Sequence, residues 1–136
     1  MQADSTTPAV SLRSVYKRFR TPDGRSFTAL ADLNLTVRDG EFLAIVGPTG
    51  SGKSTTLTLV SGLEPPSAGE VQVYGEPLRE LNPHAGYMFQ ADALFPWKSV
   101  LENVAAGPLF RGVPRATAVA QSRDWIQRVG LAGFEG

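Results

Sequence analysis

The sequence contains no cysteine and a single histidine, His84. Without cysteine, the chain has no disulfide framework, no cysteine metal site and no thiol nucleophile. Charge of one sign is not in excess either, because 13 acidic residues balance 13 lysines and arginines. This balance gives no electrostatic reason to expect nucleic acid or an anionic membrane surface as the main partner.

Long apolar runs are also missing. The longest run covers only residues 42–46, far short of the roughly 18 residues that span a bilayer. Residues 1–8 are polar and lack the apolar centre of a signal peptide, so we expect a disordered lead-in there. With 136 residues, 42% of them hydrophobic, the chain is predicted to be a folded cytosolic protein of one domain.

Several short segments are predicted to form strands. Alternating or mixed apolar residues predict strands over 10–19, 33–37 and 71–73, and a short apolar run predicts another over 87–89. Residues 21–24 (TPDG) have the composition of a turn. Residues 41–46 (EFLAIV) are continuously apolar after the first position, as in a strand covered on both faces of a parallel sheet.

Three helices are predicted by their termini and periodicity. Residues 53–61 form the first, which Gly62 ends. Ser99 and Glu102 have the spacing of a capping box, so a second helix begins near residue 100 and ends near 107 or 110. Pro114 begins the third and Gly130 ends it. Five residues of this last helix are expected on one buried face: Ala118, Ser122, Trp125, Ile126 and Val129.

Residues 47–54 (GPTGSGKS) carry the strongest chemical signal. Glycines let this backbone curl until its amides point inward at an anion, and the following helix adds its positive N-terminal end. Lys53 supplies a charge to the outer phosphates, and the Ser54 hydroxyl is placed to coordinate Mg²⁺. The segment is therefore predicted to be a phosphate-binding loop, although the loop alone fits kinases, GTPases, motor ATPases and transporter ATPases.

Longer stretches resemble one of these classes, the ATP-binding subunit of ABC transporters. They are ALADLNLTVRDGEFLAIVGPTGSGKSTTL, VSGLEPPSAGEVQVYG, GYMFQADALFPWKSVLENV and VGLAGF, in the order and at the spacing of that family. The LFPW segment at 94–97 resembles the importers of nitrate, sulfonate, taurine and related small solutes. The resemblance implies an α/β P-loop NTPase fold of the ABC type, which combines a RecA-like core with an antiparallel β subdomain.

The resemblance also assigns site residues. Gln90 matches the Q-loop glutamine, which is expected to contact Mg²⁺ and the attacking water. Gln90 and Lys53, which supplies charge to the outer phosphates, are the expected catalytic residues. Phe19 matches the aromatic that stacks on adenine. The residues expected to bind Mg-ATP through the phosphate loop are Gly47, Pro48, Thr49, Gly50, Ser51, Gly52, Lys53, Ser54 and Thr55.

Partners and location follow from the same resemblance. We expect transmembrane permease subunits, a second ATP-binding subunit in a homodimer and, indirectly, a periplasmic solute-binding protein. The chain is expected to lie peripherally on the cytoplasmic side of the cell membrane.

Hydrolysis in this class needs an acidic pair after an apolar strand. No aspartate here follows four consecutive apolar residues, none precedes a glutamate, and there is no LSGGQ-like segment or later switch histidine. We expect an N-terminal fragment truncated before these parts, with a nucleotide-binding core over 9–95 and an incomplete helical subdomain over 96–136. This chain alone is predicted to be inactive.

Two other classes share the loop. A small-molecule kinase would use residues 107–116 as an arginine-bearing lid, and a non-catalytic nucleotide-binding module would need no acid.

Several residues are expected to have ordinary roles. His84 is predicted to be a surface loop residue, whereas Trp97 could contact a membrane partner or cover the core. The basic residues near the N-terminus are expected on a solvated strand face: Arg13, Lys17, Arg18 and Arg20.

Overall fold

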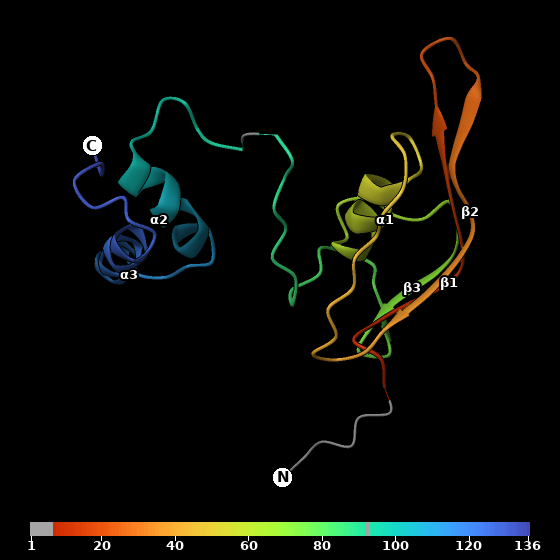
Figure 1. Ribbon diagram of the computed structural model, residues 1–136, viewed down its shortest axis with the longest axis horizontal. Coiled ribbons are helices and arrows are strands. Elements are labelled where there is room, and N and C mark those ends of the chain that lie inside the picture. The colour runs from red at the N-terminus through yellow and green to blue at the C-terminus, as the bar shows by residue number, and fades with distance from the viewer. Residues whose placement is uncertain (1–6, 92) are drawn as a thin grey trace. The chain divides into compact units, whose positions relative to one another are not determined.

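The computed structural model describes residues 7–91 and 93–136 (Figure 1). The chain divides into two compact units, Met1–Tyr87 and Met88–Gly136. Most of the lead-in expected over residues 1–8 lies outside the described residues. Throughout the described ranges, no helix combines the length and the apolar character needed to cross a bilayer.

The first unit is built on an antiparallel sheet (Figure 1). Its strands are β1 (Val10–Arg20), β2 (Ser26–Val37), β3 (Ala68–Val73) and β4 (Glu76–Pro77), in the order β2-β1-β3-β4. The strands predicted over 10–19, 33–37 and 71–73 are confirmed. β2 begins earlier than predicted, because the β1–β2 hairpin stays paired up to its turn.

The predicted turn at residues 21–24 joins β1 to β2. The Thr21 amide donates to the Arg25 carbonyl at 2.8 Å, and the Gly24 amide donates to the Thr21 carbonyl at 2.9 Å. Asp23 accepts a hydrogen bond from the Thr21 hydroxyl and one from Arg25 Nε at 2.5 Å. The turn fixes the register of the hairpin, in which Phe19 pairs with Phe27.

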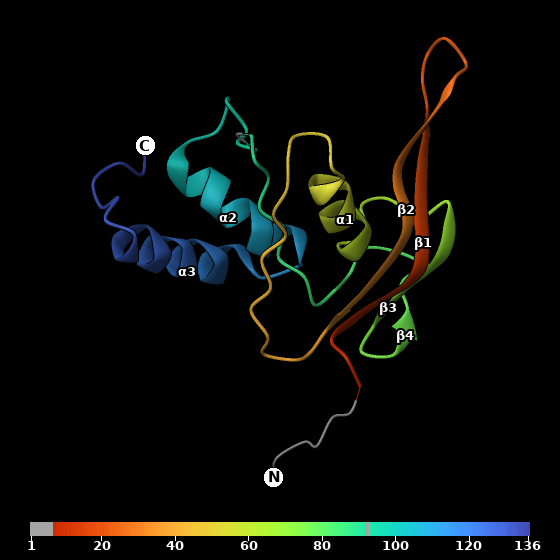
Figure 2. The same ribbon diagram turned by 45° about the vertical axis from the view of Figure 1, so that its right-hand side comes forward.

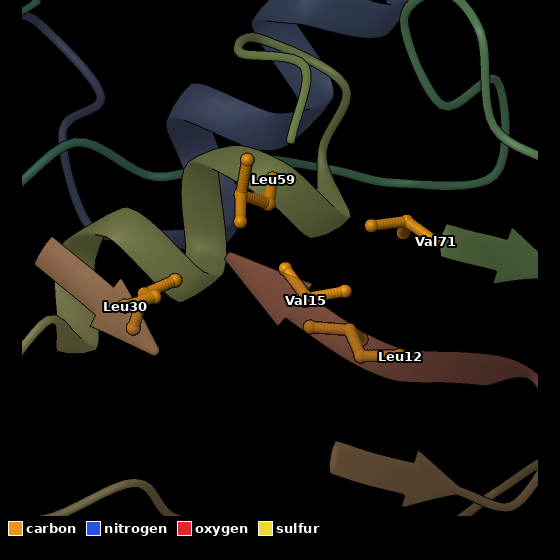
Figure 3. Close-up of a cluster of buried hydrophobic side chains, with 5 residues drawn as sticks. All are labelled: Leu12, Val15, Leu30, Leu59 and Val71. Carbon is orange, nitrogen blue, oxygen red and sulfur yellow. The ribbon is translucent and has the colours of Figure 1, made fainter. Parts of the chain in front are cut away.

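Helix α1 (Lys53–Val60) packs on this sheet. Leu59 of the helix meets four strand residues, Leu12, Val15, Leu30 and Val71, in a buried cluster (Figure 3). Gly62 follows the helix with a φ of +75°, as predicted for its end. A side chain there would lie 2.1 Å from the Glu80 carbonyl oxygen, so the close approach of this loop also requires glycine.

Two predicted strands, residues 41–46 and 87–89, are wrong. Neither forms a strand, and every residue from 41 to 46 is exposed, with Phe42 at 93% and Val46 at 87%. A continuous apolar run indicates burial on both faces but supplies no backbone partner. Within the described sheet only β1 to β4 pair, so nothing there hydrogen-bonds the 41–46 backbone as a neighbouring strand.

The second unit holds α2 (Val100–Phe110) and α3 (Arg115–Arg128), which lie side by side (Figure 2). The capping box is confirmed, because Ser99 Oγ accepts from the Glu102 amide and Glu102 accepts from the Ser99 amide. The buried residues of the pair are mostly small, which lets the two helices approach closely. They are Ala105, Ala106, Ala118, Ser122 and Ile126.

The face expected to be buried on the third helix is partly wrong. Trp125 is 58% exposed and Val129 is 65% exposed. The buried stripe follows Ala118, Ser122 and Ile126 at intervals of four residues, which places Trp125 at its margin. There the Arg128 guanidinium lies 5.1 Å from the centre of the Trp125 ring.

Candidate functional site

The N-terminus of α1 is open to an anion. Gly52 precedes the helix in the left-handed region, at φ 88° and ψ 5°. Among the described residues no side chain caps this end, and the first turn contains no acidic residue. The first amides of the helix therefore point outward without a side-chain acceptor, and the helix dipole favours a negative group beside them.

Gly52 is also in close contact with strand β2. A Cβ atom at this position would lie 2.6 Å from Leu30 Cδ2 and 2.8 Å from the Ala29 carbonyl oxygen. Leu30 belongs to the buried cluster, so it has little room to move. The start of α1 is thus fixed against the sheet by a contact that only glycine permits.

Lys53 turns back into the curl of residues 47–52. Its ammonium donates to the carbonyl oxygens of Gly47 at 2.9 Å and Pro48 at 2.7 Å, and to Ser51 Oγ at 3.3 Å. These contacts hold a positive charge inside a loop whose residues are mostly exposed to solvent. A phosphate that reaches the helix N-terminus would therefore meet this ammonium as well.

A cleft of about 200 Å³ opens beside this loop. It brings Phe19 of β1 together with the start of α1, although the two are more than thirty positions apart in the sequence. The described residues that line it are Phe19, Phe27, Ala29, Gly50, Gly52, Lys53, Ser54 and Thr55. Its lining combines aromatic rings with backbone amides, an ammonium and hydroxyls, as a ligand with a ring and an anionic tail requires.

Phe27 is a residue of this cleft that the sequence reading missed. It pairs directly with Phe19 across the hairpin and is 54% exposed. The signal was present in the TPDG turn, because a hairpin that turns around residue 23 places residues 19 and 27 opposite each other.

The prediction that the basic residues of β1 lie on a solvated face is wrong for Lys17. Arg13, Arg18 and Arg20 are exposed, but Lys17 is only 7% exposed. Its ammonium donates to Glu64 Oε2 at 2.7 Å and to the Pro65 carbonyl at 2.8 Å, and lies 5.0 Å from the centre of the Phe19 ring. Lys17 therefore connects the loop after α1 to the strand that carries Phe19.

The remaining candidates are not among the residues that line this cleft. Gln90 is exposed and belongs to the second unit, so its contact with Mg²⁺ stays a prediction. His84 is exposed in a loop, as expected. Trp97 is 76% exposed, so it does not cover a core.

The residues present suit a nucleotide with its metal. The outward amides of α1 and Lys53 fit a polyphosphate, and the hydroxyl of Ser54, at the second position of the helix, is a hard oxygen ligand of the kind that Mg²⁺ prefers. None of the described residues that line the cleft is acidic. Nor does the described part of the chain gather three or more His, Cys, Asp or Glu side chains that could hold a metal by themselves.

Comparison with known proteins identifies the family. The model of the family described as "ABC transporter" matches residues 30–136, which include the phosphate loop, α1 and the whole second unit. The chain belongs to the ABC transporter family.

Relatives in the ABC family are import proteins by name. The chain is 44% identical over 110 residues to the taurine import ATP-binding protein TauB of Burkholderia pseudomallei, which covers 81% of this chain and 42% of TauB. It is 42% identical over 130 residues to the spermidine/putrescine import ATP-binding protein PotA of Rubrobacter xylanophilus, covering 93% of this chain and 33% of PotA. The chain thus spans about two fifths or less of the length of these relatives.

Solved ABC cassettes share the fold. A dimeric structure of the ATP-binding cassette MJ0796 with ADP and phosphate superposes with a TM-score of 0.78 at 28% identity, over 93% of this chain and 60% of the cassette. A second dimeric MJ0796 structure gives a TM-score of 0.80 at 27% identity. The predicted resemblance and the ABC-type P-loop fold are therefore confirmed.

Proposed function

We propose that this chain is the nucleotide-binding portion of an ATP-binding subunit that hydrolyses ATP to power import of a small solute through an ABC transporter. The cleft at the start of α1 carries the proposal, because an uncapped helix N-terminus and Lys53 line it together with the exposed aromatic side chain of Phe19. Family membership supports the same ligand. One MJ0796 cassette structure contains ADP and phosphate, which are the products of ATP hydrolysis.

Each residue of the cleft has a distinct part in this proposal. The amides of residues 47–55 and the Lys53 ammonium bind the phosphates, and Phe19 stacks on the base. Outside the cleft lining, Gln90 would join Ser54 as a protein ligand of Mg²⁺ and would orient the attacking water. Bound Mg²⁺ would neutralise charge on the outer phosphates.

The solute is proposed by analogy with the named relatives. TauB proteins support a sulfonate of the taurine type, in line with the LFPW segment at 94–97. PotA matches over a longer stretch and imports polyamines by name, so the cleft itself does not discriminate between solutes. This agrees with a division of labour in which other subunits select the solute and this chain binds nucleotide.

The proposed partners are membrane permease subunits and a second copy of the ATP-binding subunit, with a periplasmic binding protein acting through the permease. The dimeric MJ0796 structures support the second copy. The exposed aromatic side chains of Trp97 and Phe110, which both contact Phe95 in the second unit, support a permease contact. We place the protein at the cytoplasmic face of the membrane on the same grounds.

The test measures binding and turnover separately. In isothermal titration, ATP should bind the unaltered chain, and Lys53→Ala should weaken binding at least about tenfold, because a charge-assisted contact to phosphate is lost. Phosphate release by this chain alone should be negligible, because no carboxylate lines the described cleft. Turnover independent of Lys53 would contradict the proposal, whereas transfer of phosphate to a small acceptor would favour the kinase alternative.

A further inference from the structure

We propose that Phe27 is a second base-contacting residue, which together with Phe19 forms a two-ring subsite that selects purine over pyrimidine nucleotides. The proposal rests on the proposed function, because it requires that the ligand of the cleft is a nucleotide. It adds a residue on β2 to the single aromatic on β1 that the sequence predicted.

The hairpin places both rings on one side of the same cleft. Phe19 and Phe27 are direct partners in the β1–β2 register. Side chains of directly opposed residues share a face of the sheet, with Cβ atoms roughly 4.5–5.5 Å apart. Both rings line the cleft that contains Gly52, Lys53 and Ser54, so a ligand whose phosphates lie at the helix N-terminus has both rings within the same hollow.

Packing of the fold does not explain Phe27. The side chain is 54% exposed and lies outside the buried cluster, which β2 enters three residues later through Leu30. An aromatic side chain that is already exposed gives up few packing contacts when it stacks on a ligand ring in the cleft. It gains apolar contact by doing so.

Phe19 by itself offers a restricted stacking surface. The Lys17 ammonium lies 5.0 Å from the centre of its ring and is held by Glu64 and the Pro65 carbonyl. One face of the Phe19 ring is thus engaged by a cation that is buried and fixed. A second ring supplies further aromatic contact that Phe19 alone cannot provide.

Two phenyl rings can distinguish nucleotide bases by their stacking area but not by their hydrogen-bonding groups. Phenylalanine has no hydrogen-bonding group, so it cannot read the edge of a base. Stacking strength instead grows with the aromatic area covered, and purines present two fused rings where pyrimidines present one. We therefore expect ATP and GTP to bind with similar affinity, and CTP to bind more weakly than both.

The experiment compares ATP, CTP and inorganic tripolyphosphate on the 136-residue chain and its variants by isothermal titration. Phe27→Ala should weaken ATP binding roughly 5- to 50-fold, as expected for loss of one stacking partner. Its affinity for tripolyphosphate should change less than about twofold, because this probe has no base to stack. The preference for ATP over CTP should shrink accordingly.

Further variants separate stacking from bulk and from folding. Phe27→Leu keeps an apolar side chain without an aromatic face and should behave like Phe27→Ala, whereas Phe27→Trp should retain ATP affinity. Phe134→Ala removes an exposed aromatic of the second unit and should leave all three affinities unchanged.

Three outcomes would overturn the proposal. Unchanged ATP affinity in Phe27→Ala, with ATP binding still weakened at least about tenfold by Lys53→Ala, would leave the proposed function intact and exclude Phe27 from the base subsite. An equal loss of ATP and tripolyphosphate affinity would show that Phe27 acts on the fold instead. Failure of the unaltered chain to bind either ligand would overturn the proposed function together with this inference.

Discussion

At the scale of single residues, the site depends on how closely the backbone approaches its neighbours. Gly50 and Gly52 both have left-handed φ angles, of +81° and +88°. Only Gly52 lies against other atoms, because open space surrounds the position of a Cβ at Gly50 within the described structure. Substitutions at these two positions therefore distinguish the free-energy cost of backbone strain alone from the cost of strain together with a steric clash.

Substitution of these glycines should give unequal losses of stability. Gly50→Ala carries only the left-handed conformation, which costs about 1–2 kcal/mol. Gly52→Ala adds a clash with Leu30 and Ala29 and should lose roughly 1–3 kcal/mol more, as overpacked sites do. Urea unfolding of both variants measures the difference. Equal losses of unfolding free energy would mean that Leu30 and Ala29 move aside at little cost to accommodate a side chain at residue 52.

Asp23 makes the β1–β2 turn sensitive to acid. The hydrogen bond from the Thr21 hydroxyl, and then that from Arg25, hold the pKa of this carboxyl below its usual 3.8. Since the folded state favours the carboxylate, its contribution to stability is present above the unfolded pKa and is lost as the pH falls through the lower folded value. An NMR titration should report this low midpoint.

Variants of the same turn provide the control. Arg25→Gln removes the guanidinium that donates to Asp23 and should move the pKa of Asp23 part of the way back toward 3.8. Asp23→Asn should remove the acid-dependent step in hairpin stability. A midpoint for Asp23 at its usual value would show that the turn contacts do not persist in solution.

At the scale of elements, one side chain secures the loop before α2. Asn103 accepts a hydrogen bond from the Phe95 amide at 2.8 Å, and its amide nitrogen lies within hydrogen-bond distance of the carbonyls of Phe95, Lys98 and Ser99. The loop in turn holds an aromatic group, in which Phe95 contacts Trp97 and Phe110. Asn103 thus ties the exposed apolar surface of the second unit to a helix.

Asn103→Ala should loosen this loop. The backbone groups of Phe95, Lys98 and Ser99, which are half-buried residues, would lose their partner, at a cost of about 2 kcal/mol. Hydrogen exchange at the Phe95 amide should accelerate more than exchange within α3. Gln121→Ala, on the exposed side of α3, is the matched control and should change neither. Unchanged protection at Phe95 would contradict the role given to Asn103.

The elements that sequence reading predicted are those with local signals. Ser99 and Glu102 define the start of α2 by themselves, and Gly62 ends α1, because capping involves only neighbouring residues. Residues 41–46 have an equally strong local pattern, yet a strand also needs a backbone partner that the pattern does not contain. Phe27 was missed for a different reason: the turn at 21–24 carried its signal, but the predicted strand began only at residue 33, whereas β2 begins at Ser26.

At the scale of the whole molecule, the exposed segment 41–46 is an apolar surface next to α1. Leu43 and Ile45 line a groove together with residues of β1, β2 and α1, while Phe42 and Val46 are almost fully exposed. Contiguous apolar surface of this kind favours association between molecules. The backbone of residues 42–46 pairs with no strand of the described sheet, so it adds hydrogen-bonding groups that another strand could use.

We expect the purified 136-residue chain to associate as its concentration rises. Replacing both Phe42 and Val46 by lysine should shift it toward monomer, because two charges then interrupt the apolar segment. Phe134→Lys in the second unit is the matched control and should have little effect. Sedimentation velocity across micromolar concentrations measures the change. A monodisperse, cooperatively melting unaltered chain would contradict this expectation.

The contact between Gly52 and Leu30 also bears on protein engineering. The glycine-rich motif at residues 47–54 depends on a contact outside its own sequence. Here its last glycine is shaped to fit a leucine on a strand more than twenty positions earlier in the chain. A designer who transplants the motif into a new scaffold should therefore transplant the β2 surface around Leu30 with it. Without that surface, the N-terminus of the transferred helix will not be held at the same position against the sheet.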